Sequence, residues 1–352
     1  MLIVVGTNYK FSPIALRERL VFSKKRLDEA FSFLKDYTGI KSAVILSTCN
    51  RVEIYANSAE SMAGADKIAK FLSVYHEIDK YRLAPYLYKY VDIEAARHLF
   101  RVASGLDSQI LGETQVLGQV QWFYEKAKTL GFTDNLIEEV FEKAEEVGKR
   151  IRVETDISKG DISIGSAVVS LIKERIGELK AKKILIIGLG KISEIVLKDL
   201  LKEDVKAVLV SNRTYEKAKQ IAKTIGAAAI RFNELRENLK GADIIISATS
   251  SPHIILRVED IREVIEDRPK TIDHRQLLII DLAVPRDVDP GAREIKGVKL
   301  YCLDDLTSII DNKLEGRNSE ISNAEKIIEE EAHKVWRKIT AIKLGYGVPS
   351  LR

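Results

Sequence analysis

The stretch AKKILIIGLGKIS, residues 181–193, decides the fold of the middle part of this chain. Its apolar run at 181–187 predicts a buried strand of a parallel sheet. The sequence GLG at 188–190 then turns the chain into a helix with an apolar inner face. This order of strand, glycine-rich turn and helix is typical of a dinucleotide-binding Rossmann unit, with Ser193 at the place of the third glycine.

The residues that follow continue the same pattern. Further strands are predicted at 207–210, 243–247 and 277–282, and a helix from Tyr215 separates the first two. The first two glycines of the 188–190 turn let the backbone approach a pyrophosphate at the helix N-terminus. The middle of the chain therefore predicts an α/β domain that binds a nucleotide.

The end of the second Rossmann strand indicates which nucleotide is bound. NAD sites usually carry Asp or Glu there, but this chain has Ser211-Asn212-Arg213-Thr214. A guanidinium and small polar groups suit a 2′-phosphate, which favours NADP(H). The alternative is that Arg213 is a surface charge and Thr214 a helix cap.

Ser47-Thr48-Cys49-Asn50-Arg51 is the second unusual stretch. It follows a buried apolar strand at 43–46 and precedes an alternating, half-buried strand at 52–56. A cysteine thus lies at a strand-to-strand corner among a hydroxyl, an amide and a guanidinium, a mixture suited to a carboxylate or carbonyl substrate. The alternative is a small buried cysteine that only packs.

The sequence GLDSQILGETQVLGQ at 105–119 forms either a polar pocket wall for a small zwitterion or a solvated loop before a helix through Ala127. Around it we expect an opening strand at 2–6, an edge strand at 86–90 and a helix from 93 to about 103 that ends at Gly105. Ser12 and Pro13 predict a helix start, with Ser12 as the N-cap and Pro13 at the first helical position.

The C-terminal pattern from Asp304 to about Leu344 predicts one long amphipathic helix. Forty helical residues span about 60 Å, which is longer than a single domain needs. We expect this helix to dock along other parts of the chain or to pair with a second copy.

Composition limits the remaining possibilities. A length of 352 residues suggests two or three domains, and the net charge of +4 neither requires nor excludes a nucleic-acid partner. The two cysteines lie far apart in the sequence, which fits a reducing cytoplasm. We find no zinc-finger spacing, no apolar run of membrane length and no signal-peptide pattern.

Taken together, these stretches resemble the glutamyl-tRNA reductase family over essentially the whole chain. The matching segments are 47–55, 97–101, 105–119, 211–214, 246–249 and 281–286. The resemblance implies NADPH-dependent reduction of glutamyl-tRNA to glutamate-1-semialdehyde, the first step of tetrapyrrole synthesis by the five-carbon route.

The resemblance also implies an architecture and partners. We expect an α/β catalytic domain at 1–155, a Rossmann-type NADPH domain at 156–300, and a long spinal helix with a shortened dimerisation region at 301–352. It implies a cytoplasmic homodimer without membrane contact and a contact with glutamate-1-semialdehyde aminomutase. A smaller dimer surface, a monomer or a shortened sequence remain open, because the family usually continues beyond this length.

The family's functional residues carry over to this sequence as follows. Cys49 matches the nucleophile, and His98 matches a histidine near the site. The substrate contacts correspond to Thr48, Asn50, Arg51, Ser108, Glu113, Thr114, Gln115 and Gln119. The cofactor loop corresponds to Gly188, Leu189, Gly190, Lys191, Ile192 and Ser193, and the second strand end contributes Asn212, Arg213 and Thr214.

The chemistry is consistent with these roles. A thiolate is a natural side chain to displace the tRNA hydroxyl from an aminoacyl ester, and nearby cations lower the pKa of a thiol. Arg51 and His98 are the candidate cations. We expect Arg51 to bind the substrate α-carboxylate and His98 to polarise the carbonyl or carry a proton, unless His98 lies on a helix surface.

Two other functions fit parts of the pattern. One is a non-catalytic relative that binds tRNA or the aminomutase, but the intact Cys49, Arg51 and His98 argue against it. The other is an NADP oxidoreductase similar to shikimate dehydrogenase, which shares the Asn-Arg-Thr pattern at 212–214. That enzyme type would need neither the Cys49 corner nor the 105–119 stretch.

Overall fold

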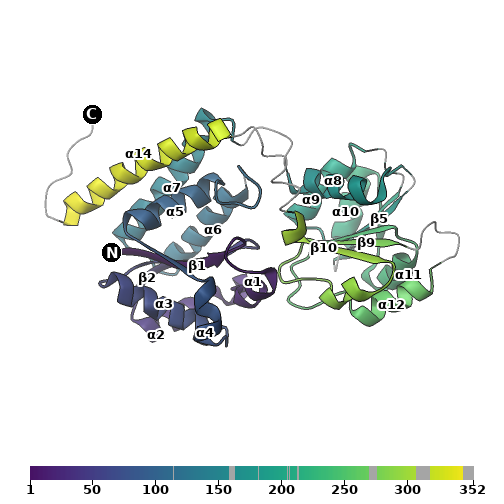
Figure 1. Cartoon of the computed structure of the whole chain (residues 1–352), viewed down its shortest axis with the longest axis horizontal. Coiled ribbons are helices and arrows are strands. Elements are labelled where there is room, and N and C mark those ends of the chain that lie inside the picture. The colour runs from purple at the N-terminus through teal and green to yellow at the C-terminus, as the bar shows by residue number, and fades with distance from the viewer. Residues whose placement is uncertain are drawn as a thin grey trace. The chain divides into compact units, whose positions relative to one another are not determined.

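The computed structural model describes residues 1–113, 115–157, 163–180, 182–203, 205, 207–211, 214–268, 276–306 and 318–343. The chain forms two compact units (Figure 1). Unit 1 comprises Met1–Gly160 together with Leu314–Arg352, and unit 2 comprises Asp161–Lys313. The C-terminal helix, predicted as part of a third region, therefore packs within unit 1.

An antiparallel sheet with the strand order β2-β3-β1-β4 forms the centre of unit 1. Its strands are β1 (Leu2–Asn8), β2 (Ser42–Ser47), β3 (Arg51–Asn57) and β4 (Tyr88–Val91). The edge position of β4 agrees with the sequence. The register pairs Asn8 with Arg51 and Ser47 with Val52, so the corner at 48–50 lies beside the end of β1.

Helices cover both faces of this sheet (Figure 1). The helices of unit 1 are α1 (Ile14–Leu20), α2 (Leu27–Thr38), α3 (Ser61–Tyr75), α4 (Lys80–Leu83), α5 (Ile93–Ser104), α6 (Gln115–Thr129), α7 (Asn135–Glu154) and α14 (Asn318–Lys343), with short 3-10 turns η1 (Lys24–Arg26) and η2 (Ala84–Tyr86). All of β3 except its last residue is buried as a consequence. The prediction that this strand is half exposed is therefore wrong, because α5 and α7 cover its polar side.

The start of α1 also differs from the prediction. The N-cap is Pro13 instead of Ser12, and no side chain caps the helix. The Ser12 hydroxyl is buried, where it accepts a hydrogen bond from Thr7 at 2.9 Å and donates one to the carbonyl of Asn8 at 3.2 Å. Because Ser12 is used inside the turn at 8–12, it is not available to cap α1. The predicted stop of α5 at Gly105 is confirmed, with Gly105 in the left-handed region at φ 82°.

The amphipathic C-terminal helix is confirmed for Asn318–Lys343, and the part predicted from Asp304 begins as a 3-10 turn, η5 (Leu303–Leu306). Residues 307–317 lie outside the described part. Helix α14 packs against α5 and α7 through buried residues that include Ala324, Ile328 and Ala332. Ion pairs such as Arg101–Glu325 border this contact, but both side chains are about one third exposed (38% and 34%). Apolar burial therefore contributes more to docking than these solvent-screened pairs.

Unit 2 is the predicted Rossmann fold, a parallel six-stranded sheet in the order β10-β9-β8-β5-β6-β7. Its strands are β5 (Lys183–Ile187), β6 (Ala207–Ser211), β7 (Ala228–Ile230), β8 (Ile244–Ser247), β9 (Leu277–Asp281) and β10 (Val298–Cys302). Its helices are α8 (Ile164–Ile176), α9 (Lys191–Leu200), α10 (Tyr215–Ile225), α11 (Leu235–Lys240) and α12 (Val258–Glu266), with 3-10 turns η3 (Phe232–Glu234) and η4 (Pro290–Glu294). The order matches the doubly wound type, in which ligands bind at the carboxyl ends of the central strands.

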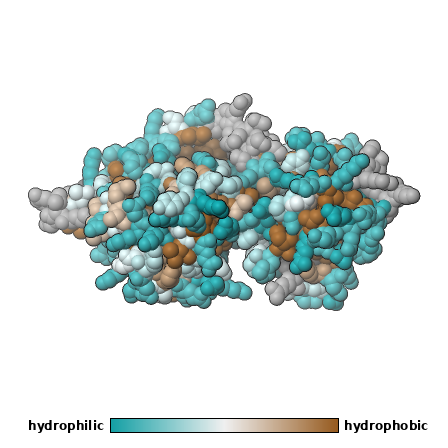
Figure 2. Space-filling view, turned by 60° about the horizontal axis from the view of Figure 1, so that its bottom comes forward, coloured by the Kyte–Doolittle hydropathy of each residue, from teal (hydrophilic) through white to brown (hydrophobic). Residues whose placement is uncertain are grey.

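The face of the molecule shown in Figure 2 is mostly hydrophilic, with hydrophobic residues gathered in patches. This agrees with a composition in which 31% of all residues are charged. Among the described helices, none is long and apolar enough to cross a membrane.

Candidate active site

Cys49 lies in the corner between β2 and β3 with a half-buried side chain. The Thr48 hydroxyl shapes this corner by accepting backbone N–H bonds from Asn50 at 3.2 Å and Arg51 at 3.3 Å. Thr48 therefore has a structural role in fixing the backbone around Cys49, in addition to its predicted contact with substrate. The carbonyl of Cys49 accepts a bond from the buried Arg17 at 3.4 Å, and the sequence analysis did not identify Arg17.

Burial raises the pKa of the Cys49 thiol to about 12, and the carboxyl of Glu113 raises it as well, whereas the cations of Arg17 and Arg51 lower it. With this pKa the thiol form prevails over the thiolate at neutral pH. Arg51 therefore lowers this pKa as predicted, but its effect is smaller than that of burial, which keeps the pKa above its ordinary value. A reaction at Cys49 must remove the proton as the sulfur attacks.

Arg51 forms a buried ion-pair network and does not point freely into solvent. Its side chain is 1% exposed, and its Nη1 lies 2.8 Å from Glu53 Oε1 and 3.0 Å from Asp107 Oδ2. Burial opposes the charge of Arg51, but Glu53 and Asp107 hold its pKa well above the usual range. A substrate carboxylate would have to displace one of these partners, and Asp107 is the more accessible at 13% exposed.

Glu53 is the centre of this network, and its side chain is fully buried. Besides Arg51, it accepts hydrogen bonds from Tyr55 at 2.7 Å and from Tyr88. Burial alone would raise the pKa of Glu53, but Arg51 and His98 outweigh burial and hold it far below its usual range. The sequence contained a signal for this residue, because Arg51, Glu53 and Tyr55 share one face of a strand at a spacing of two.

His98 lies inside unit 1, and the alternative of a surface histidine is wrong. Its Nε2 is 2.8 Å from Glu53 Oε1, and its ring packs against Tyr88 and Tyr90 at centroid distances of 5.1 and 5.0 Å. Because the ionised Glu53 can only accept, Nε2 must carry the hydrogen of this bond. His98 is thus oriented by Glu53.

The turn at 8–12 joins the Cys49 corner to the polar stretch after α5. The backbone N–H of Tyr9 donates to the carbonyl of Asn50 at 2.9 Å. Asn8 and Lys10 donate to the two oxygens of Asp107 at 3.0 and 2.7 Å. The sequence analysis named none of these three residues, because only tertiary contacts place them at the site.

The stretch at 105–119 folds back toward Cys49 and is largely buried. Gly105 is required there, since a Cβ at this position would lie 3.0 Å from backbone atoms of Glu113. Ser108 is buried and its carbonyl accepts a bond from the Tyr9 hydroxyl at 3.1 Å. Burial raises the pKa of Glu113, while Arg51 partly offsets this rise. A solvated loop, the alternative for this stretch, is wrong.

Gln115 and Gln119 are half-buried and lie one turn apart at the start of α6, while Thr114 lies outside the described residues. Arg152 of α7 was not predicted, but its Nη2 donates to the carbonyls of Ala103 at 3.1 Å and Glu113 at 3.3 Å. Arg152 therefore links α7 to both ends of the segment at 103–113. Within the described residues, no group of three or more His, Cys, Asp or Glu side chains is placed to hold a metal ion.

The glycine-rich turn of unit 2 has the shape that a dinucleotide requires. Gly188 has φ 88°, and a Cβ there would lie 2.7 Å from the carbonyl oxygen of Ala248. Gly190 is the N-cap of α9, and a Cβ there would meet nothing nearer than 4.0 Å. The helix N-terminus thus has open space before it, which fits a pyrophosphate. Ser193 is fully buried, so it packs in the place of the third glycine instead of facing a ligand.

Lys191 and Ile192 form the first turn of α9 after Leu189, and Thr214 is the N-cap of α10 without a side-chain cap. Asn212 and Arg213 lie outside the described residues. Lys217 of α10 donates its Nζ hydrogen to the carbonyl of Leu189. The sequence analysis did not identify Lys217.

The buried carboxyl group of Asp287 stabilises the segment that packs against the glycine-rich turn at 188–190. Asp287 accepts hydrogen bonds from the hydroxyls of Ser247 at 2.7 Å and Thr249 at 2.5 Å. These bonds hold the segment after β8 against Gly188. Burial raises the pKa of the neighbouring Asp281 to about 7, so this acid at the end of β9 is half protonated near neutral pH.

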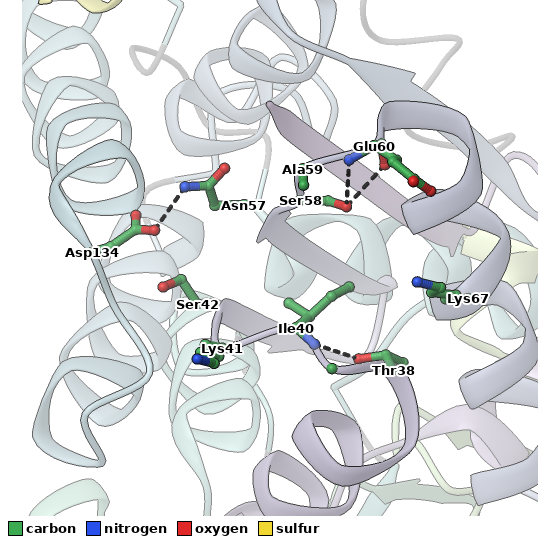
Figure 3. Close-up of a pocket in the computed structure, with 11 residues that line it drawn as sticks. Thr38, Ile40, Lys41, Ser42, Asn57, Ser58, Ala59, Glu60, Lys67 and Asp134 are labelled. Atoms are coloured by element: carbon green, nitrogen blue, oxygen red, sulfur yellow. Dashed lines mark hydrogen bonds between the residues drawn. The ribbon is translucent and has the colours of Figure 1, made fainter. Parts of the chain in front are cut away.

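A separate cavity of about 440 Å³ opens at the other end of β2 and β3. Figure 3 shows its polar lining, where the Asn57 amide donates to Asp134 at 2.7 Å. None of the predicted catalytic or substrate residues lines it. The Cys49 corner, and not this cavity, is therefore the candidate active site.

Comparison with known proteins agrees with this division. A family model described as the N-terminal domain of glutamyl-tRNA(Glu) reductase matches residues 5–155, and a shikimate/quinate 5-dehydrogenase model matches residues 170–309. A glutamyl-tRNA reductase of Trichlorobacter lovleyi is 38% identical over 351 residues, covering 100% of this chain and 80% of the relative. One of Pelotomaculum thermopropionicum is 40% identical over 331 residues, covering 94% and 74%.

A solved structure titled glutamyl-tRNA reductase from Methanopyrus kandleri is also similar. It is 39% identical with a TM-score of 0.52, and the match covers 97% of this chain and 81% of that one. The similarity therefore spans both compact units and includes the Cys49 corner as well as the Rossmann sheet. The chain belongs to the glutamyl-tRNA reductase family.

Proposed function

We propose that this chain reduces glutamyl-tRNA(Glu) to glutamate-1-semialdehyde with NADPH through a thioester on Cys49. This is the first step of tetrapyrrole biosynthesis by the five-carbon route. The observation that carries the proposal is the half-buried Cys49 thiol at a corner fixed by Thr48 and Arg17, in a chain with a Rossmann unit. The shikimate-dehydrogenase alternative accounts only for residues 170–309.

In the first step the Cys49 sulfur attacks the ester carbonyl of glutamyl-tRNA. A carbon–sulfur bond forms, the carbon–oxygen bond to the ribose breaks, and the thiol proton passes to the released tRNA hydroxyl. Glu113, which interacts electrostatically with Cys49 and has a raised pKa, is a candidate to relay this proton. When bound, NADPH supplies the hydride that converts the thioester to the aldehyde and frees Cys49.

Substrate contacts come from the corner and from the start of α6. The buried Oδ1 of Asn50 has no hydrogen-bond partner among the described residues, which suits an acceptor for the substrate ammonium group. Gln115 and Gln119 offer further amides. We propose that Arg51 binds the substrate carboxylate after that carboxylate displaces Asp107. Glu53 stays bound to Arg51.

The 2′-phosphate of NADPH gives a prediction for Lys217. We expect Lys217→Ala to weaken NADPH binding about tenfold, because an ammonium–phosphate bond contributes about 1.5–3 kcal/mol before solvent screening. Binding of NADH, which lacks this phosphate, should be unchanged. The dissociation constants can be measured from the fluorescence of the bound nicotinamide. Lys219→Ala, an exposed lysine on the same helix, is the matched control, and equal losses for both nucleotides would contradict the assignment.

Incubation with glutamyl-tRNA and NADPH tests the proposed function directly. We expect one semialdehyde to form for each NADPH oxidised. If the protein binds glutamyl-tRNA but oxidises no NADPH, the non-catalytic alternative holds. If it oxidises shikimate with NADP instead, the dehydrogenase alternative holds.

We further propose the domain roles stated above, with residues 1–155 binding glutamyl-tRNA, 156–300 binding NADPH and 301–352 leading to a dimer contact. The family resemblance supports a homodimer, a cytoplasmic location and transfer of the semialdehyde to the aminomutase. Light scattering measures the dimer, and a clean monomer with full activity would contradict it.

A further inference from the structure

The turn at 8–12 presents an exposed aromatic ring beside the reactive corner. Phe11 is 45% exposed, although large aromatic side chains are usually buried. Its ring packs edge-on against the buried Tyr88, with 5.0 Å between centroids and 65° between planes. Nearly half of this side chain is therefore accessible to a ligand.

This turn is held rigidly to the groups around Cys49. The backbone N–H groups of Phe11 and Ser12 both donate to the carbonyl of Asn8 at 3.0 Å. The neighbouring Tyr9 bonds the corner at Asn50 through its backbone at 2.9 Å and Ser108 through its hydroxyl at 3.1 Å. Phe11 lies two residues from Tyr9 and Cys49 lies one residue from Asn50, so the Tyr9–Asn50 hydrogen bond keeps Phe11 and Cys49 within roughly 15 Å of each other.

The substrate brings a particular group to this distance. The glutamyl carbonyl that Cys49 attacks is esterified to the ribose of the 3′-terminal adenosine of tRNA. The adenine base must therefore lie within a few bonds of the reacting carbon, next to the corner. Nucleic-acid-binding proteins commonly hold unpaired terminal bases by stacking them on exposed aromatic rings.

We propose that Phe11 is the stacking platform for the 3′-terminal adenine of glutamyl-tRNA. The proposal rests on the proposed function for its substrate. Stacking on Phe11 positions the ester beside Cys49, while the residues at 105–119 bind the glutamyl group. The charge of Lys10 is already compensated by Asp107 at 2.7 Å, so the ring, and not this cation, supplies the contact.

Binding of uncharged tRNA tests the stacking without using activity. The probes are glutamate tRNA with and without its 3′-terminal adenosine, measured by fluorescence anisotropy on the full-length protein. In the wild type, removal of the adenosine should weaken binding about tenfold, within the range found for base–aromatic stacking. In Phe11→Ala the two tRNAs should bind equally, within about twofold, and Phe11→Trp should restore the difference.

Matched variants separate stacking from folding. Tyr81→Ala removes a ring that is 76% exposed on α4, and it should keep the wild-type difference between the two tRNAs. Phe11→Leu keeps apolar contact with Tyr88 without a ring and should behave as Phe11→Ala, which covers the case in which the alanine variant does not fold. An undiminished adenosine effect in Phe11→Leu or Phe11→Ala would overturn the proposal.

Steady-state kinetics distinguish failure of this inference from failure of the proposed function. With active wild type, Phe11→Ala should raise the KM for glutamyl-tRNA about tenfold and leave the KM for NADPH unchanged. A raised KM for NADPH alone would assign Phe11 to a contact with unit 2 and overturn the proposal. If the wild type itself reduces no glutamyl-tRNA, the proposed function fails, while the binding comparison still decides whether Phe11 stacks on adenine.

Discussion

Cys49→Ser should reduce kcat/KM for glutamyl-tRNA reduction by about a thousandfold or more, and no acyl-enzyme should accumulate when NADPH is withheld. A serine hydroxyl is a much weaker nucleophile than sulfur, and an ester at this position accepts hydride less readily than a thioester. The measurement is semialdehyde formation together with trapping of radiolabelled glutamate on the protein. Cys302→Ser is the matched control, because Cys302 lies in β10 of unit 2 and should be dispensable.

The raised pKa of Cys49 gives this prediction a pH dependence. With a pKa of about 12, about one molecule in 100,000 carries the thiolate at pH 7. Because only the thiolate is alkylated, the rate of modification by iodoacetamide should rise about tenfold for each pH unit between pH 7 and 10. Normal reduction by the serine variant would exclude the thioester, and a rate of alkylation that levels off below pH 8 would show that the thiol is activated after all.

Glu53→Gln should destabilise unit 1 by about 3 kcal/mol at pH 7, because it leaves the buried Arg51 without its closest charged partner. Both tryptophans, Trp122 and Trp336, belong to unit 1, so their fluorescence during urea unfolding reports on this unit alone. Glu60→Gln, at an exposed carboxylate before α3, is the control and should change the free energy of unfolding by less than about 0.5 kcal/mol.

The effect of Glu53 should also depend on pH in a defined direction. Its pKa is lowered in the folded protein, so its charge stabilises the fold fully above the unfolded pKa of about 4.3. As the pH falls below that value, the wild type should lose this stabilisation, and the difference between wild type and Glu53→Gln should shrink. A difference that stays constant from pH 7 to pH 3 would show that the lost contribution is packing and not charge.

Much of the architecture was predictable from local patterns. The Rossmann sheet follows from apolar strands at regular distances and from the glycines at 188 and 190, which the backbone geometry of the turn requires. The strands around Cys49, the stop at Gly105 and the helix over 318–343 also follow from residue type and periodicity. These features depend on interactions between residues that are close in the sequence, so the order of residues is enough to predict them.

The environment of the catalytic corner was not predictable in the same way. The alternation in β3 predicts one polar, solvent-facing side, yet Arg51 and Glu53 are buried under helices. Their ion pairs and hydrogen bonds depend on Asp107 and His98, which lie about 50 residues further along the chain. A local sequence pattern does not show which side chains of a later helix will pack against a strand.

Short motifs of particular residues were sufficient to identify the nucleotide fold and the family of the chain, and they singled out Cys49 as the candidate nucleophile. Only the folded structure shows that Arg51 is bound by Glu53 and Asp107, that burial raises the pKa of Cys49 and that Phe11 stays exposed beside the corner. The reason is that burial changes the free energy of a charged group and therefore its pKa. Whether a side chain is buried or exposed depends on segments that only folding brings together.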